Sequence, residues 1–316
     1  MAAPAPARLT ITAVPGITVG HANVPAHGTG CTVILGPVSG LRAAVALRGR
    51  ATGTREIDAL SPRHLVERID AILFAGGSAY GLGAADGVMR WLRERGRGLP
   101  VGTLGTIPIV PTAVIFDLGN AGKPVGWPGP EDGYRACDAA GEDFAAGATG
   151  VGTGATVGKA AGIDKMMPAG LGTWAERAGD VVVGVLTVLN AVGDVRNGRG
   201  EIIAGARGPD GRFLDSMRYL ANGGAPFGDP ERLTRNTTLA VIATNAALDR
   251  VQLEALAQAG SDALARRITP YGTLYDGDVV FAVSTAAVPA ASALQVEALA
   301  ALAVPEAVER SVRVAG

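Results

Sequence analysis

The chain has 316 residues, of which 48% are hydrophobic and 18% are charged, and its formal net charge is −1 at pH 7. This near-neutral balance gives no electrostatic case for binding nucleic acid or an anionic membrane surface. The length allows a sizeable hydrophobic core, and the two cysteines, Cys31 and Cys137, are too few for a disulfide framework.

The N-terminal segment MAAPAPARLT has neither the basic stretch nor the apolar stretch of a signal peptide. No apolar run reaches the ~18 residues of a membrane span. We therefore expect a cytoplasmic protein with no membrane or nucleic-acid partner.

Predicted strands and helices follow one another in mixed order along the chain. Apolar runs predict strands at 8–14, 31–36, 43–48, 70–75, 181–190, 202–206, 238–244 and 278–285. Helical periodicity predicts helices at 80–95, 133–146, 249–268 and 290–302. Several strands are apolar on both faces, which is typical of strands buried between layers. Strands in groups with helices between them favour an α+β fold, and the Gly/Pro-rich stretches 119–133 and 221–236 are predicted loops.

Two glycine-rich segments approach nucleotide-binding motifs without matching them. TGATVGKA (153–160) lacks the first Gly of a phosphate loop and the Ser/Thr that would bind a metal. GGSAYGLGAADG (76–87) does not keep the dinucleotide spacing. His21, His27 and His64 are not grouped with other ligands at metal-binding spacing, and no G-x-S-x-G elbow marks a serine triad. We therefore expect neither a metal nor another cofactor.

Four polar residues stand in otherwise apolar segments. Asn190 ends the run 181–190, where a buried amide needs a partner. Asp276 and Asp278 begin an apolar strand two residues apart, so in an extended chain their carboxylates face one side and repel unless a cation lies between them. Lys159 is a lone ammonium in a Gly/Ala-rich segment. Each of these residues, taken alone, is more often structural than catalytic.

The segment TRNTTLAVIATNA (234–246) places Asn236 and Thr237 directly before an apolar strand. One interpretation is a simple turn, and the other is a bond that the protein cuts in itself. A Thr hydroxyl needs a base within hydrogen-bond reach to act as a nucleophile. Cleavage before Thr237 would give it a free α-amine with a pKa of about 7.7–8.0. That amine can serve as the general base near neutral pH, without a histidine.

Six segments, in the same order, resemble the self-cleaving aminopeptidase family. That family includes the L-aminopeptidase/D-amidase/D-esterase, the β-aminopeptidases and the nylon-oligomer hydrolases. Within it the chain looks most similar to the nylon-oligomer (6-aminohexanoate-oligomer) hydrolase branch, which also cleaves between Asn and Thr. The segments are LFAGGSAYGLGAADGVMRWL (73–92), IPIVPTAVIFDLG (107–119), GTGATVGKAAG (152–162), VLNAVGDV (188–195), NTTLAVIATNA (236–246) and DGDVVFAVST (276–285).

The resemblance implies a four-layer α-β-β-α sandwich, like the N-terminal-nucleophile hydrolases in architecture but differently connected. It implies a single domain over residues 1–316 that cuts itself into 1–236 and 237–316. The two pieces would stay folded together, and the protein would be a homo-oligomer, a homotetramer by family resemblance.

The resemblance also implies roles for individual residues. Thr237 matches the new N-terminal nucleophile, Lys159 the active-site lysine and Asn190 the oxyanion-hole asparagine. Asp276 and Asp278 match the paired acidic residues. In addition, Phe116 in the substrate pocket stands where the nylon hydrolases carry Tyr, so the phenol hydroxyl is absent and Asn190 is left with more of the oxyanion stabilisation.

The function implied is hydrolysis of linear amide bonds in peptides or ω-amino-acid oligomers, without a cofactor. One alternative is an acyltransferase of the ornithine-acetyltransferase type, which would pass the acyl group to an added amine instead of water. The other is an uncleaved, non-catalytic protein in which the Asn236–Thr237 segment is only a turn.

Overall fold

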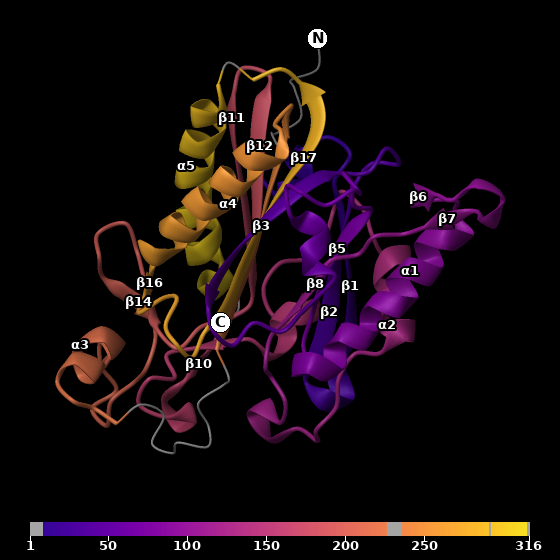
Figure 1. The fold of residues 1–316 in the computed structure, drawn as a ribbon. Helices are drawn as coiled ribbons and strands as arrows, with labels where there is room; N and C mark the ends of the chain where they lie inside the picture. The colour runs from indigo at the N-terminus through magenta and orange to yellow at the C-terminus, as the bar shows by residue number, and fades with distance from the viewer. Residues whose placement is uncertain (1–8, 226–235, 291, 315–316) are drawn as a thin grey trace, which may run out of the picture.

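A computed structural model describes residues 9–225, 236–290 and 292–314 of the chain. Two five-stranded sheets lie against each other, and a pair of helices covers the outer side of each sheet (Figure 1). The predicted α+β fold with four α-β-β-α layers is therefore confirmed. No helix in the described part of the chain is both long enough and apolar enough to cross a membrane.

The first sheet is built from the N-terminal part of the chain. Its strands, in spatial order, are β1 (Thr18–Val24), β2 (Thr29–Leu35), β5 (Ala71–Ala75), β8 (Thr112–Val114) and β4 (Thr54–Arg55). Strands β5 and β8 are parallel, and the other neighbours are antiparallel. The outer face of this sheet packs on α1 (Ala84–Glu94) and α2 (Pro130–Asp138).

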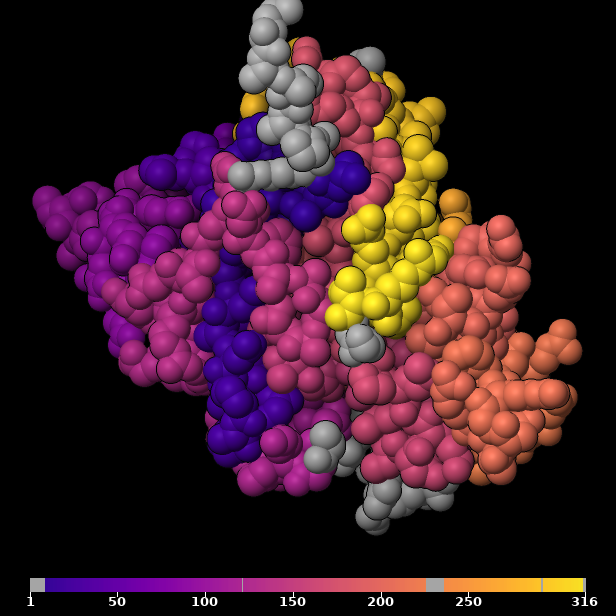
Figure 2. Space-filling view, turned by 180° about the vertical axis from the view of Figure 1, so that it is seen from behind, coloured from indigo at the N-terminus to yellow at the C-terminus, as the bar shows by residue number. Residues whose placement is uncertain are grey.

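The second sheet takes most of its strands from the C-terminal part of the chain. Their spatial order is β11 (Leu171–Ala178), β12 (Val181–Asn190), β15 (Thr237–Ala246), β17 (Gly277–Val288) and β3 (Arg42–Gly49). Strands β15 and β17 run parallel. Its outer face is covered by α4 (Arg250–Ala265) and α5 (Ala293–Arg313); α5, in yellow, lies along the surface seen from behind (Figure 2).

Shorter elements lie between the main strands and helices along the chain. The strand pieces are β6 (Leu99–Pro100), β7 (Thr106–Ile107), β9 (Thr156–Val157), β10 (Met167–Pro168), β13 (Asp194–Arg196), β14 (Ile202–Ala204) and β16 (Ile268–Thr269), and α3 spans Ser216–Ala221. The 3₁₀ turns are Ile11–Ala13, Pro25–His27, Ile57–Leu60, Ser78–Gly83, Gly102–Leu104, Asn120–Gly122, Gly150–Gly154 and Ile163–Lys165.

The core between the sheets is made of side chains from both inner faces. Phe74 of β5 and Phe281 of β17 are fully buried, and their ring centroids lie 5.9 Å apart. Strands β12 and β15 are buried along their whole length because a layer covers each of their faces. This burial explains why their sequences are apolar at consecutive positions instead of alternating.

Several predicted boundaries differ from the structure. The strand predicted at 8–14 is wrong: its described part, 9–14, holds the 3₁₀ turn Ile11–Ala13, and the N–H of Ile11 donates to the Thr173 hydroxyl of β11 at 2.9 Å. The helix predicted at 133–146 is instead α2, which begins at Pro130 and ends at Asp138. Helix α5 continues past residue 302, through Pro305, because its next turns are buried against the second sheet. Part of the predicted loop 221–236 lies outside the described residues.

Candidate active site

The Asn236–Thr237 bond lies where β15 begins, in the middle of the second sheet. Thr237 pairs with Asn190, the last residue of β12. On the other side, Asn236 forms a parallel bridge with Asp276, directly before β17. The ends of three adjacent strands therefore bring Asn190, Asn236, Thr237 and Asp276 to one place, as expected if these residues act together.

The carbonyl group of Asn236 receives two hydrogen bonds on its oxygen. The Thr237 hydroxyl donates to it at 2.6 Å, and the backbone N–H of Gly277 donates to it at 3.0 Å. The Gly277 N–H draws electron density from the carbonyl carbon and can stabilise negative charge that develops on the oxygen during attack, while the Thr237 hydroxyl is the group that would attack. The hydroxyl that could attack is thus held against the bond that it would break.

Gly277 contributes a hydrogen bond to the site that the sequence did not predict, because the donor is its backbone N–H. A Cβ at this position would lie 2.4 Å from the carbonyl oxygen of Ala51, so the close approach of β17 to residue 51 requires glycine. The available signal was the Gly between Asp276 and Asp278, which marks a place where two backbones meet.

Lys159 and Asn190 form a buried hydrogen-bonded pair. The Lys159 ammonium donates to the Asn190 side-chain oxygen at 2.6 Å and to its backbone oxygen at 2.8 Å. The Thr156 N–H and hydroxyl reach the same side-chain oxygen at 3.3 Å. Because all of these donors need the oxygen, the amide nitrogen must point the other way, where it donates to the Phe116 carbonyl at 3.1 Å. The amide is therefore fixed in orientation, as an oxyanion donor would have to be.

Asp276 and Asp278 are held by different backbone donors. Asp276 accepts from the N–H of Thr273 at 2.8 Å. Asp278 accepts from the N–H of Thr238 at 2.5 Å with one oxygen and from the N–H of Gly272 at 3.1 Å with the other. These contacts connect the paired carboxylates to the first residues of β15.

Burial raises the pKa of both carboxyl groups above the ordinary Asp value. At Asp276 the hydrogen bonds from Thr273 and the charge of Lys159 act in the opposite direction. At Asp278 the charge of Asp276 adds to burial, and the pKa is raised further. The pair therefore protonates more readily than exposed aspartates do, and perturbed carboxyl groups of this kind are typical of functional sites.

These raised pKa values predict an effect of Asp276→Asn on stability. An Asp whose pKa is raised by folding is penalised in its charged form, so the free energy of unfolding falls as pH rises from the ordinary Asp pKa through the raised one. Asn at 276 keeps an oxygen for the Thr273 N–H and carries no charge. We expect the variant to be more stable than the parent at pH 7, because Asn carries no charge for burial to penalise.

The measurement is urea unfolding between pH 3 and pH 7, with Thr237→Ala in both proteins so that every chain stays continuous. The difference should shrink towards zero at the acid end, where the carboxyl group is protonated in both the folded and the unfolded state. Parallel pH profiles for the two proteins would show that Asp276 carries no charge penalty.

Polar atoms without partners cluster at the same bond. Among the described residues, the side-chain nitrogen and the side-chain oxygen of Asn236 are buried and have no hydrogen-bond partner. Leaving such atoms unpaired costs about 1–3 kcal/mol each. A concentration of this cost around one peptide bond is typical of a site built for chemistry.

Asp117 is a second residue beside the site that was not predicted from the sequence. It is fully buried and accepts from the Thr29 hydroxyl and the Gly77 N–H, each at 2.6 Å. Burial raises its pKa, while these two hydrogen bonds and the charge of Lys159 lower it. Asp117 thereby fixes the chain next to Phe116, whose carbonyl accepts from Asn190. The feature of the sequence that could have indicated Asp117 is a lone Asp inside the apolar segment AVIFDLG.

A cavity of about 520 Å³ adjoins this cluster. Thr156, which contacts the Asn190 side chain, is one of its lining residues, together with Pro25, Gly28, Asn120, Lys123 and Met166. Phe116 was predicted as a pocket residue; its side chain is half-buried, and it is not among the described residues that line this cavity. Its backbone carbonyl, not its ring, makes the described contact with Asn190.

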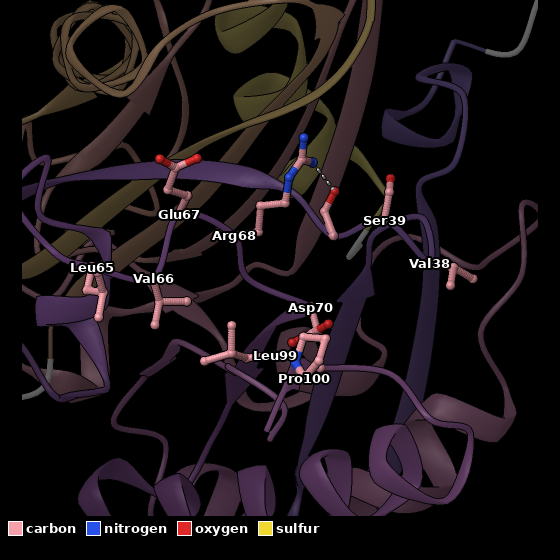
Figure 3. Close-up of a pocket in the computed structure, with 11 residues that line it drawn as sticks. Val38, Ser39, Leu65, Val66, Glu67, Arg68, Asp70, Leu99 and Pro100 are labelled. Atoms are coloured by element: carbon pink, nitrogen blue, oxygen red, sulfur yellow. Dashed lines mark hydrogen bonds between the residues drawn. The ribbon is translucent and has the colours of Figure 1, made fainter. Parts of the chain in front are cut away.

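A second cavity, of about 400 Å³, lies elsewhere. Val66, Leu99 and Pro100 line it beside Asp70, and the Arg68 side chain reaches the Gly40 carbonyl at 3.1 Å (Figure 3). None of the described residues that line it belongs to the cluster around Thr237. The 520 Å³ cavity is therefore the candidate substrate site. No group of three or more metal-binding side chains comes together among residues 9–225, 236–290 and 292–314.

Comparisons with known proteins cover most of the chain. The sequence model of Peptidase family S58 matches residues 10–315. An uncharacterized aminopeptidase of Mycobacterium tuberculosis is 44% identical over 302 residues, which cover 88% of this chain and 82% of that protein. A 6-aminohexanoate-oligomer endohydrolase of Kocuria sp. is 33% identical over 276 residues, which cover 86% of this chain and 73% of that protein.

Solved structures agree on the fold. A β-aminopeptidase of Burkholderia sp. has a TM-score of 0.68 at 22% identity, over 98% of this chain and 88% of that one. The L-aminopeptidase D-Ala-esterase/amidase of Ochrobactrum anthropi has a TM-score of 0.65 at 20% identity, over the same shares of the two chains, and is described as a new variant of the N-terminal-nucleophile hydrolase fold.

The two facing sheets and their covering helices thus define a variant of the N-terminal-nucleophile hydrolase fold. The chain belongs to peptidase family S58 and is an amide hydrolase of the aminopeptidase type. The acyltransferase and non-catalytic interpretations are not retained. The mycobacterial relative shares more residues with this chain than the oligomer hydrolase does, so the comparisons support the family and not the nylon branch.

Proposed function

We propose that the protein cuts its own Asn236–Thr237 bond and then hydrolyses amides with Thr237 as its N-terminal nucleophile. The observation that carries the proposal is the Thr237 hydroxyl, which donates at 2.6 Å to the carbonyl oxygen of the residue before it. The Gly277 N–H supports the same carbonyl from the other strand. The 5% exposure of Thr237 in the continuous chain also supports it, because cutting would create the free amine and open the nucleophile to substrate.

Self-cleavage would begin with attack of the Thr237 hydroxyl oxygen on the Asn236 carbonyl carbon. The C–N bond breaks as the hydroxyl proton passes to the amide nitrogen, which converts the amide into an ester. Water then hydrolyses the ester, so that Asn236 ends in a carboxylate and Thr237 keeps its hydroxyl and gains an amine.

In turnover, the Thr237 amine would take the hydroxyl proton as the oxygen attacks the substrate carbonyl. The Asn190 amide would donate to the oxyanion. The leaving amine takes a proton, and water releases the acyl group from Thr237. The Lys159 charge would disfavour protonation of the Thr237 amine and keep it basic. Asp276 and Asp278 would balance that charge and orient the start of β15.

The names of the relatives support a substrate class of peptides or ω-amino-acid oligomers. Three of these names refer to aminopeptidases and one to a 6-aminohexanoate-oligomer endohydrolase. We further propose that the protein acts in the cytoplasm, and that it is a homo-oligomer, as the family resemblance implies. Its place in the nylon branch stays a proposal.

Intact-mass spectrometry of the purified wild-type protein tests the proposal. We expect the full-length mass to be replaced by the masses of residues 1–236 and 237–316. The two pieces should elute together on size exclusion, because β15 pairs with strands of both pieces. A wild-type chain that stays intact through purification and long incubation would refute self-cleavage.

A further inference from the structure

The 520 Å³ cavity beside Asn190 has one charged group. Among the described residues that line it, Lys123 is the one ionisable side chain, and the others are apolar or neutral. Its volume is in the range of sites that hold small ligands. We propose that this cavity binds the apolar part of an amide substrate that ends in a carboxylate, and that Lys123 recognises this carboxylate. The inference rests on the proposed function and names the substrate class of the same site.

The walls of the cavity are tied to one another. The Asn120 amide donates to the Gly154 carbonyl at 2.8 Å and joins the loop after β8 to the 3₁₀ turn Gly150–Gly154. On another side, Thr156 of β9 pairs with Pro168 of β10. These contacts hold the cavity open as a shaped site with apolar walls that include Met166 and Pro168.

Lys123 is positioned at this cavity by its neighbours. The stem of Lys123 passes over Gly28, where an added Cβ would lie 3.0 Å from its Cγ atom. The next residue, Pro124, offers its carbonyl to a ring nitrogen of His27 at 3.1 Å. The backbone of the lysine is therefore anchored to the β1–β2 connection, while its exposed ammonium can meet a group that enters from solvent.

The charge of the cavity selects between the two ends of an amino-acid-derived substrate. A substrate ammonium placed here would face a like charge, and none of the described lining residues carries a carboxylate to hold it. Asp117 lies behind Gly154, but it is fully buried and its oxygens accept from Thr29 and Gly77. A methylene or aliphatic segment suits the apolar walls, and a terminal carboxylate suits Lys123.

The effect expected from one partly exposed ion pair is modest. Loss of the Lys123 charge should raise KM roughly three- to fivefold for a carboxylate substrate. It should leave kcat unchanged, because the contact is the same in the bound substrate and in the transition state. Reversal of the charge in Lys123→Glu should raise KM further, and added salt should weaken the preference because the pair is exposed.

The test uses two substrates that differ only at one end: L-alanyl-6-aminohexanoate and its terminal carboxamide. Self-cleaved wild type, Lys123→Gln and Lys165→Gln are compared. Lys165 is a matched control, since it is a partly exposed lysine that pairs with Asp164 and is not among the described lining residues. We expect wild type and Lys165→Gln to prefer the acid through a lower KM, and Lys123→Gln to lose this preference with the carboxamide unaffected.

The outcomes separate the two proposals. Three results would overturn the carboxylate site. The first is equal KM values for acid and carboxamide in wild type, and the second is an unchanged preference for the acid in Lys123→Gln. The third is a chain that has cut itself and hydrolyses neither compound. A chain that stays intact and hydrolyses neither compound would instead refute the proposed function.

Discussion

Thr237→Ala should leave the chain in one piece and abolish amide hydrolysis. The substitution removes the hydroxyl that donates to the Asn236 carbonyl at 2.6 Å, so no oxygen is left to attack that bond. It also prevents the free amine from forming, and with it the general base for turnover. Intact-mass spectrometry should show only the full-length mass, and activity should fall to the uncatalysed rate.

Two neighbouring substitutions serve as matched controls. Thr237→Ser keeps a hydroxyl in the same place and should still cut, though more slowly because the missing methyl group leaves the oxygen less constrained. Thr238→Val removes the next hydroxyl and its contact with the Asp278 carboxylate, while the N–H of residue 238 still donates to Asp278. This variant should cut normally. A Thr237→Ala protein that is cut at the same bond would disprove the nucleophile assignment.

Under the proposed function, the burial of the site would link self-cleavage to substrate access. In the continuous chain, Asn190 and Asp278 are as inaccessible as Thr237. The residues that would serve turnover therefore already lie together before any bond is cut. Cleavage need not assemble them; it has to free the amine and let substrate approach. This explains how one cluster can support two reactions in sequence.

The sequence predicted the central layers well because a long continuous apolar run needs a covering layer on both of its faces. Strands such as β12 and β15 are covered in this way, so apolar side chains follow one another along them. The prediction for residues 8–14 was wrong for a related reason: Ile11 and Val14 are buried, yet the backbone turns there, and the Ile11 N–H donates to the Thr173 side chain instead of to the backbone of a strand. Burial alone does not distinguish a strand from a buried turn.

The residues proposed for the site were predictable because polar groups inside apolar segments must be satisfied. Asn190 and Lys159, chosen for this reason and for the family resemblance, do contact each other. The Gly277 N–H was not predictable, since a backbone donor has no side chain to mark it. The cavity was not predictable either, because its shape depends on tertiary contacts such as the one between Asn120 and Gly154.

Asn190→Ala should lower kcat by roughly 10²–10³-fold, the cost of losing one oxyanion donor, which is about 3–4 kcal/mol. The Asn190 amide nitrogen is oriented by Lys159 and Thr156, which occupy the side-chain oxygen. In the described contacts Phe116 offers this amide only a backbone carbonyl, and its ring has no hydroxyl that could take over the donor role.

Steady-state kinetics on a small amide substrate should distinguish a hydrogen-bond donor role of Asn190 from a purely structural role. KM should change little in Asn190→Ala, because a ground-state carbonyl gains less from the donor than the oxyanion does. Asn190→Asp is the matched variant: it keeps an oxygen for Lys159 and Thr156 but replaces the N–H₂ group by an acceptor, so it should lose kcat as severely. Thr156→Val removes only one donor to the amide oxygen and should cost far less. If Asn190→Asp retained kcat, or if Asn190→Ala changed KM alone, the role of Asn190 would be to position the substrate. The oxyanion donor would then have to be sought among backbone N–H groups such as that of Gly277.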